Sequence, residues 1–73
     1  MATISARRLM ARIAGGMRMG DRKRLADAMG VPPQAVSRAI SGARPTSAVV
    51  AEIAARYGYV PADQDGFFRP RET

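Results

Sequence analysis

The chain has 73 residues and a formal net charge of +6, from twelve Lys and Arg against six Asp and Glu, and it contains no Cys and no His. A chain of this length forms one small domain, and its composition excludes disulfides, Cys/His zinc sites and catalysis by Cys or His. We therefore expect no metal, no cofactor and no enzymatic activity, and oligomerisation is the remaining means of adding stability.

Two helices are predicted in the first part of the chain. The first covers about residues 4–14, and its apolar residues recur at helical spacing. These residues are Leu9, Met10, Ile13, Ala14 and Met17. The second covers about residues 22–29, with Asp21 as the N-cap and Gly30 as a left-handed residue at the C-terminal end.

Two more helices are predicted after the second one. The third begins at Pro33, because proline suits the first helical position, and it ends at Gly42. The fourth is capped by Thr46 or Ser47 and is stopped by Gly58. The apolar residues spaced for burial are Val36, Ala39 and Ile40 in the third helix, and Val49, Val50, Ile53, Ala54 and Tyr57 in the fourth.

The last part of the chain is predicted to be a separate tail. We divide the sequence into a main domain at residues 1–60 and a C-terminal tail at residues 61–73. Phe67 and Phe68 are the only phenylalanines, and such side chains do not favour water. They either close the core or, with Tyr59, form a dimerisation surface.

The second and third helices carry a spaced pattern of small and apolar residues. Two helices that cross through a tight turn need a small residue at the contact, which Ala26 supplies. The turn needs a residue that tolerates positive φ, which is Gly30. Val36, a β-branched apolar residue, fills the crossing from the third helix. The pattern predicts a helix-turn-helix.

The same stretch resembles a known family. Residues 21–61 read DRKRLADAMGVPPQAVSRAISGARPTSAVVAEIAARYGYVP. The order Leu25-Ala26, Gly30-Val31 and Val36-Ser37-Arg38 resembles the helix-turn-helix of the phage repressor and Cro family. The resemblance implies an all-α fold, a compact bundle of four to five helices like that of lambda repressor, and sequence-specific binding of double-stranded DNA.

In this family the third helix lies in the major groove, with its N-terminal residues toward the base edges. The matching outward residues here are Pro33, Gln34, Ser37 and Arg38. Gln34 can pair with adenine and Arg38 with guanine, whereas Ser37 can bond either base. Pro32 and Pro33 depart from the family's polar residues, so Pro33 offers only an apolar contact, such as one with a thymine methyl group.

Further residues are expected to contact DNA phosphates and to fix the register of the protein on the duplex. They are Arg18, Arg22, Lys23, Ser41, Arg44 and Thr46. For Arg7, Arg8 and Arg12, an ordinary solvated helix face is favoured over direct contact.

The distribution of charge agrees with an anionic partner. Residues 1–44 hold nine basic and two acidic side chains, net +7, whereas residues 45–73 hold three basic and four acidic ones, net −1. This asymmetry indicates nucleic acid or an anionic membrane surface. No apolar run approaches the ~20 residues that a membrane span needs.

The leading hypothesis is a homodimeric repressor of phage or mobile-element type that occupies an inverted-repeat operator. It would act in the cytoplasm of a bacterium or a phage-infected host, with no membrane or small-molecule partner. One alternative is an antitoxin that binds a toxin and represses its own operon. The other is a basic peptide that acts at membranes through the first helix.

Overall fold

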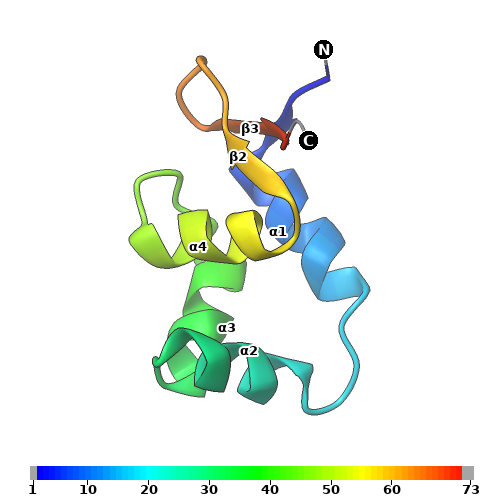
Figure 1. The fold of residues 1–73 in the computed structure, drawn as a ribbon, viewed down its shortest axis with the longest axis vertical. Helices are drawn as coiled ribbons and strands as arrows, with labels where there is room; N and C mark the ends of the chain where they lie inside the picture. The colour runs from blue at the N-terminus through cyan, green and yellow to red at the C-terminus, as the bar shows by residue number, and fades with distance from the viewer. Residues whose placement is uncertain (1, 72–73) are drawn as a thin grey trace.

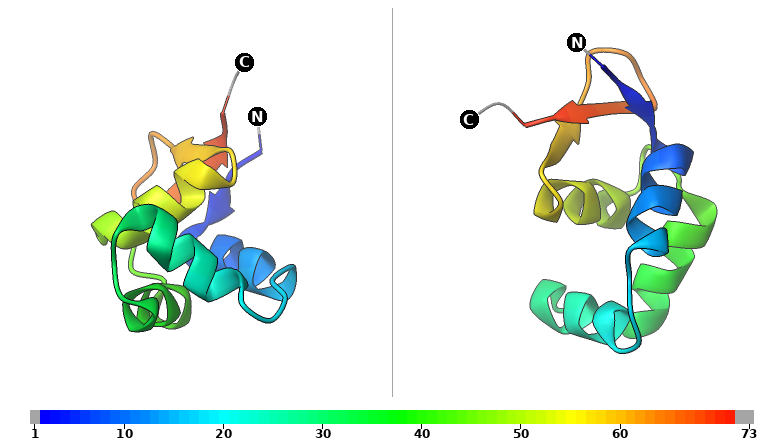
Figure 2. Two further views of the ribbon diagram at one scale, coloured as in Figure 1. Left: turned by 60° about the horizontal axis from the view of Figure 1, so that its bottom comes forward. Right: turned by 90° about the vertical axis from the view of Figure 1, so that its right-hand side faces the viewer.

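The computed structural model describes residues 2–71. Its elements are β1 (Ile4–Ser5), α1 (Ala6–Gly15), α2 (Asp21–Met29), α3 (Pro33–Gly42), α4 (Ala48–Arg56), β2 (Tyr59–Pro61) and β3 (Phe67–Pro70). The strands lie at one end of the longest axis of the molecule, and α2 lies at the other end (Figure 1). Figure 2 shows α1 beside α3, with which it is in contact.

The expectation of an all-α fold is corrected by a small sheet. β3 pairs antiparallel with β1 and with β2, so the strand order is β1-β3-β2. Phe68 lies opposite Ile4 on one side and Pro61 on the other. Strands this short cannot display the alternation of apolar and polar residues by which a sequence predicts a strand. The division proposed between residues 60 and 61 falls inside β2.

Two helix starts differ from the predicted ones. α1 begins at Ala6 because the preceding Ile4–Ser5 pair forms β1, and the Ser5 hydroxyl accepts a hydrogen bond from the Arg8 N–H at 3.2 Å. Asp21 is not the N-cap of α2: Gly20 holds that position with φ +87°, and Asp21 is the first helical residue. The Asp21 carboxylate instead accepts a hydrogen bond from the Arg18 N–H at 2.7 Å, which closes the preceding loop.

The ends of α3 and the start of α4 are as predicted. α3 runs from Pro33 to Gly42, although Ala43 rather than a glycine takes the left-handed conformation after it, with φ +48°. Ser47 caps α4 by accepting a hydrogen bond from the Val50 N–H at 3.3 Å. The prediction that Tyr57 is buried is wrong, because α4 ends before it and leaves it 45% exposed.

The core draws on all four helices and the sheet. Its buried residues are Ala6, Leu9, Met10, Ile13, Ala26, Val36, Ala39, Ala43, Val50, Ile53, Ala54 and Phe68. Phe68 comes from the central strand and is buried, whereas Phe67 and Tyr59 are half-buried. The sheet therefore closes one end of the core.

Candidate nucleic-acid interface

The crossing of α2 and α3 has the geometry that the sequence predicts. Ala26 and Val36 are both fully buried where the two helices meet. Gly30 adopts φ +70°, and the Val31 N–H donates to the Ala26 carbonyl at 3.0 Å, which closes the C-terminal end of α2. A Cβ on Gly30 would meet nothing within 4 Å. Glycine is therefore needed there for its backbone conformation rather than for space.

The two prolines set how the chain enters α3. Pro32 is the extended N-cap residue, with φ −65° and ψ 148°, and Pro33 is the first helical residue. The Pro32 carbonyl accepts a hydrogen bond from the Ala35 N–H at 2.9 Å, which forms the first turn. Neither proline has an N–H to offer a DNA phosphate or base. The first side chain of α3 that can make a polar contact is therefore Gln34.

One face of α3 is open to solvent along its length. Gln34, Ser37, Arg38 and Ser41 have the i, i+3, i+4 and i+7 spacing of a single helix face, and all four are exposed. None of these side chains bonds to another residue within the described range 2–71. The opposite face packs into the core. α3 thus presents a row of hydrogen-bonding groups that have no partner among the described residues, while its other face is anchored in the core.

The predicted phosphate contacts lie at both flanks of this helix. Arg22 and Lys23 are exposed on the first turn of α2, and Arg44 and Thr46 are exposed in the loop between α3 and α4. Arg18 is exposed in the loop before α2. In the described part of the chain no ion pair involves any of the four cations in this group. Their charge is therefore available to an external anion.

A hollow lies between α3 and the start of α4, with Arg38 as its lining residue from the outer face of α3. It measures about 560 Å³ and includes Arg38 and Arg44 with Ser47 in its lining. Beside Ser47, the N–H groups of Ala48 and Val49 have no backbone partner within residues 2–71. Free N–H groups at a helix N-terminus favour anions. This hollow therefore combines two guanidinium groups with helix N–H donors.

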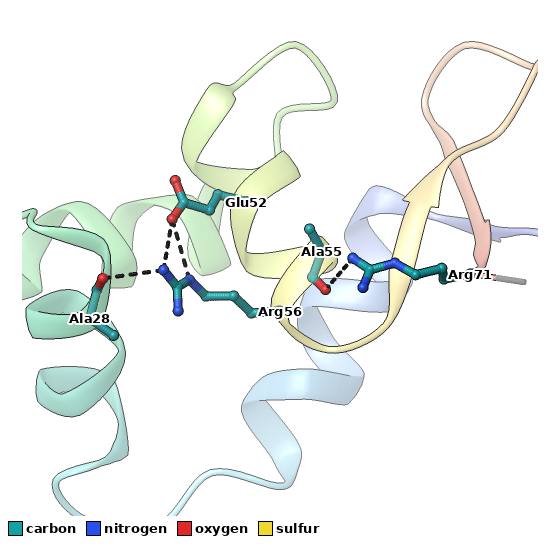
Figure 3. Close-up of polar contacts among 5 residues, drawn as sticks. All are labelled: Ala28, Glu52, Ala55, Arg56 and Arg71. Carbon is teal, nitrogen blue, oxygen red and sulfur yellow. Dashed lines mark hydrogen bonds and ion pairs between the residues drawn. The ribbon is translucent and has the colours of Figure 1, made fainter. Parts of the chain in front are cut away.

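Two arginines that the sequence did not single out hold the helices in place (Figure 3). Arg56 donates from Nη2 to the Ala28 carbonyl at 3.2 Å and to Glu52 Oε2 at 3.1 Å, which links α4 to the end of α2. Arg71 donates from Nη2 to the Ala55 carbonyl at 3.0 Å. The i, i+4 spacing of Glu52 and Arg56 predicts their ion pair. The contact of Arg56 with α2 has no corresponding pattern in the sequence.

The three residues expected at a dimer interface do not share one surface. Phe68 is in the core of its own chain. Tyr59 packs against that core, whereas Phe67, the neighbour of Phe68 in β3, points to the opposite face of the sheet.

Two other kinds of site are absent from the described residues. Within residues 2–71 no group of three or more His, Cys, Asp or Glu side chains could hold a metal ion. No helix in this part of the chain is long and apolar enough to cross a bilayer.

Comparison with known proteins agrees with the geometry. A family model described as Helix-turn-helix matches residues 10–64, which include α2, α3 and α4. No significant match to this chain is found among curated proteins or among solved structures. Because the match covers most of the chain and contains the whole crossing, the chain belongs to the Cro/C1-type helix-turn-helix family of DNA-binding transcriptional regulators.

Proposed function

We propose that this protein is a dimeric repressor of phage or mobile-element type, which blocks a promoter in the bacterial cytoplasm by occupying an inverted-repeat operator. The observation that carries this proposal is the outer face of α3, which is exposed, unbonded within the described residues and flanked by free cations. A helix of this kind fits the major groove of B-DNA, which is wide enough to admit it.

Base recognition is assigned to three side chains of α3. Arg38 bonds bidentately to guanine O6 and N7, and Gln34 bonds bidentately to adenine N6 and N7. Ser37 lies between them on the same face and contacts either base. Pro33, exposed at the first turn, contributes an apolar contact with a thymine methyl group.

The surrounding cations bind the phosphate backbone. Arg22 and Lys23 contact phosphates on one side of the groove, and Arg44 contacts a phosphate in the hollow on the other side. Arg18, Ser41 and Thr46, all exposed, extend these contacts. Each neutralised phosphate releases counterions, so the affinity falls steeply as the salt concentration rises.

Two copies are needed to read both halves of an inverted repeat. Their recognition helices would enter successive major grooves about 34 Å apart. Of the residues expected at the dimer contact, Phe67 lies on the outer face of the sheet, so we place the contact there. Sedimentation of the wild-type protein at micromolar concentration tests this part, since a monomer both free and on DNA would contradict it.

The function is tested by selecting bound sites from a random library of DNA duplexes with the full chain. The proposal predicts enrichment of one inverted repeat with half-sites about one helical turn apart. Equal retention of all sequences would contradict sequence-specific repression. The antitoxin alternative keeps the same DNA interface and adds a surface for a toxin, so a toxin gene beside this one would favour it.

A further inference from the structure

The arginines of α1 fall on two different flanks of that helix. Arg7 lines a hollow that also includes Arg44 and Pro45 of the loop between α3 and α4. Arg8 and Arg12 are four residues apart and therefore share a face. They line a second hollow, which contains no residue of that loop. The two hollows therefore differ in the residues that surround the arginine side chains.

The second hollow has a cationic side and an apolar side. It measures about 480 Å³, and its lining is Ala2, Thr3, Ile4, Arg8, Arg12, Tyr59 and Pro70. Tyr59 and Pro70 lie opposite each other in the register of β2 and β3, so their side chains share a face of the sheet. Phe68 lies two residues before Pro70 in β3, so its side chain is on this face too. Ile4, which is opposite Phe68, therefore belongs to the same face. The sheet thus supplies an apolar wall that faces two guanidinium groups.

Both guanidinium groups are without a bonding partner among the described residues. Arg8 and Arg12 are exposed, and neither side chain makes a hydrogen bond or an ion pair with another residue in the range 2–71. Among the described residues, no acidic side chain lines the hollow. Within residues 2–71 a ligand that brings carboxylates would meet no competing acidic group, and apolar groups beside those carboxylates would pack on Ile4 and Tyr59.

The hollow lies outside the surface assigned to DNA. None of its lining residues belongs to α2, α3 or α4, and the sheet lies at the end of the molecule away from α2 (Figure 1). Placing a charged phosphate against an apolar wall costs free energy. A peptide with acidic and apolar side chains instead contacts both sides of the hollow favourably.

We propose that this hollow binds a short segment of a partner protein that carries carboxylates next to an aromatic or aliphatic side chain. The carboxylates pair with Arg8 and Arg12, and the apolar side chain packs against Tyr59 and Ile4. Because these residues are not in the DNA interface, the segment can bind while α3 occupies its operator. This surface goes beyond the proposed repression by occupancy and gives the regulator a second kind of partner.

The probe for this proposal is a fluorescein-labelled peptide of sequence Asp-Glu-Phe-Asp-Leu-Glu, and binding to the full chain is followed by fluorescence anisotropy. The expected result is saturable binding that weakens at least ~10-fold when Arg8→Glu and Arg12→Glu are combined. Arg7→Glu is the matched control for Arg8→Glu and for Arg12→Glu made singly: it makes the same charge change on the same helix but on the other flank, with an expected effect below ~2-fold. An Arg8→Gln, Arg12→Gln variant with an unchanged circular dichroism spectrum shows that lost binding is not lost folding.

Three results would overturn the proposal. The first is equal binding of a peptide in which Asn, Gln and Ser replace the acidic and apolar residues. The second is an equal loss of peptide binding in the Arg7→Glu control. The third is a loss of operator affinity in the Arg8, Arg12 variant as large as that of Arg44→Glu, which would place the hollow on DNA. The site selection from random duplexes uses no peptide, so failure of the proposed repression is distinguished from failure of this site.

Discussion

Arg56 Nη2 lies 3.2 Å from the carbonyl oxygen of Ala28 and so joins the last residue of α4 to the last turn of α2. Carbonyls in the last turn of a helix lack helical partners, and a cation is favoured there. α2 and α4 both pack against α3, which carries the base-reading face. The contact therefore joins the two helices that support α3, the recognition helix.

Arg56→Ala is expected to lower the free energy of unfolding by about 1 kcal/mol, the upper end for an exposed pair, because the Ala28 carbonyl and Glu52 both lose a donor. This corresponds to a fall in Tm of roughly 4–8 °C for a domain of this size. Thermal and urea unfolding followed by circular dichroism measure it. Arg24→Ala is the matched control: its pair with Asp21 is longer, at 3.6 Å, and the Arg24 side chain is 82% exposed. Equal losses in the two variants would contradict the role given to Arg56.

Gly30→Ala is expected to destabilise the protein by about 1–2 kcal/mol, because an L-residue must then adopt φ +70°. Gly15→Ala is expected to stabilise it by about 0.5–1 kcal/mol, because Gly15 is helical and a Cβ there meets nothing within 4 Å. Urea denaturation of the two variants compares the same chemical change in two backbone conformations. A shift of the same sign in both would contradict the account of the turn.

Phe68→Ala is expected to cost about 3–5 kcal/mol, because the ring is only 3% exposed and its loss leaves a cavity between the sheet and the helices. A domain this small has little stability to lose, so the variant should be largely unfolded at 37 °C. Phe67→Ala, one residue away on the other face of the sheet, should keep a cooperative unfolding transition. Similar losses in both variants would contradict the placement of Phe68 in the core.

Lys23→Ala and Arg44→Ala are each expected to weaken binding to all duplexes by a similar factor, because a phosphate contact carries no base information. Each should also reduce the slope of log K against log salt by about 1. Titrations at several salt concentrations measure this slope. Arg12→Ala removes the same charge from α1 and should leave the slope nearly unchanged, so an equal reduction in that variant would show a field effect instead of direct contact.

The helix-turn-helix could be predicted because its requirements are local. Ala26, Gly30 and Val36 all lie within the short stretch 26–36. Each meets a different requirement of a tight helix crossing. Proline at the start of α3 and serine at the start of α4 are likewise local signals, and Ser47 makes the predicted capping bond.

The remaining features depend on residues that are distant in the sequence. The pairing of Ile4 with Phe68 joins opposite ends of the chain, and it shortens the predicted first helix by using Ile4–Ser5 as a strand. Asp21 bonds back to Arg18 instead of capping its own helix, since Gly20 already provides the left-handed entry to α2. The Arg56 contact with Ala28 also has no local signature. Such pairings become visible only once the chain is folded.

Base recognition by Arg38 is best measured with a double-mutant cycle on the selected operator. Binding of the wild type and of Arg38→Ala is measured at one salt concentration, on the operator and on versions with single G·C pairs replaced. We expect one G·C pair per half-site whose replacement costs the wild type about 1–3 kcal/mol and costs the Arg38→Ala variant almost nothing. Equal costs in both proteins at every position would contradict base recognition by Arg38.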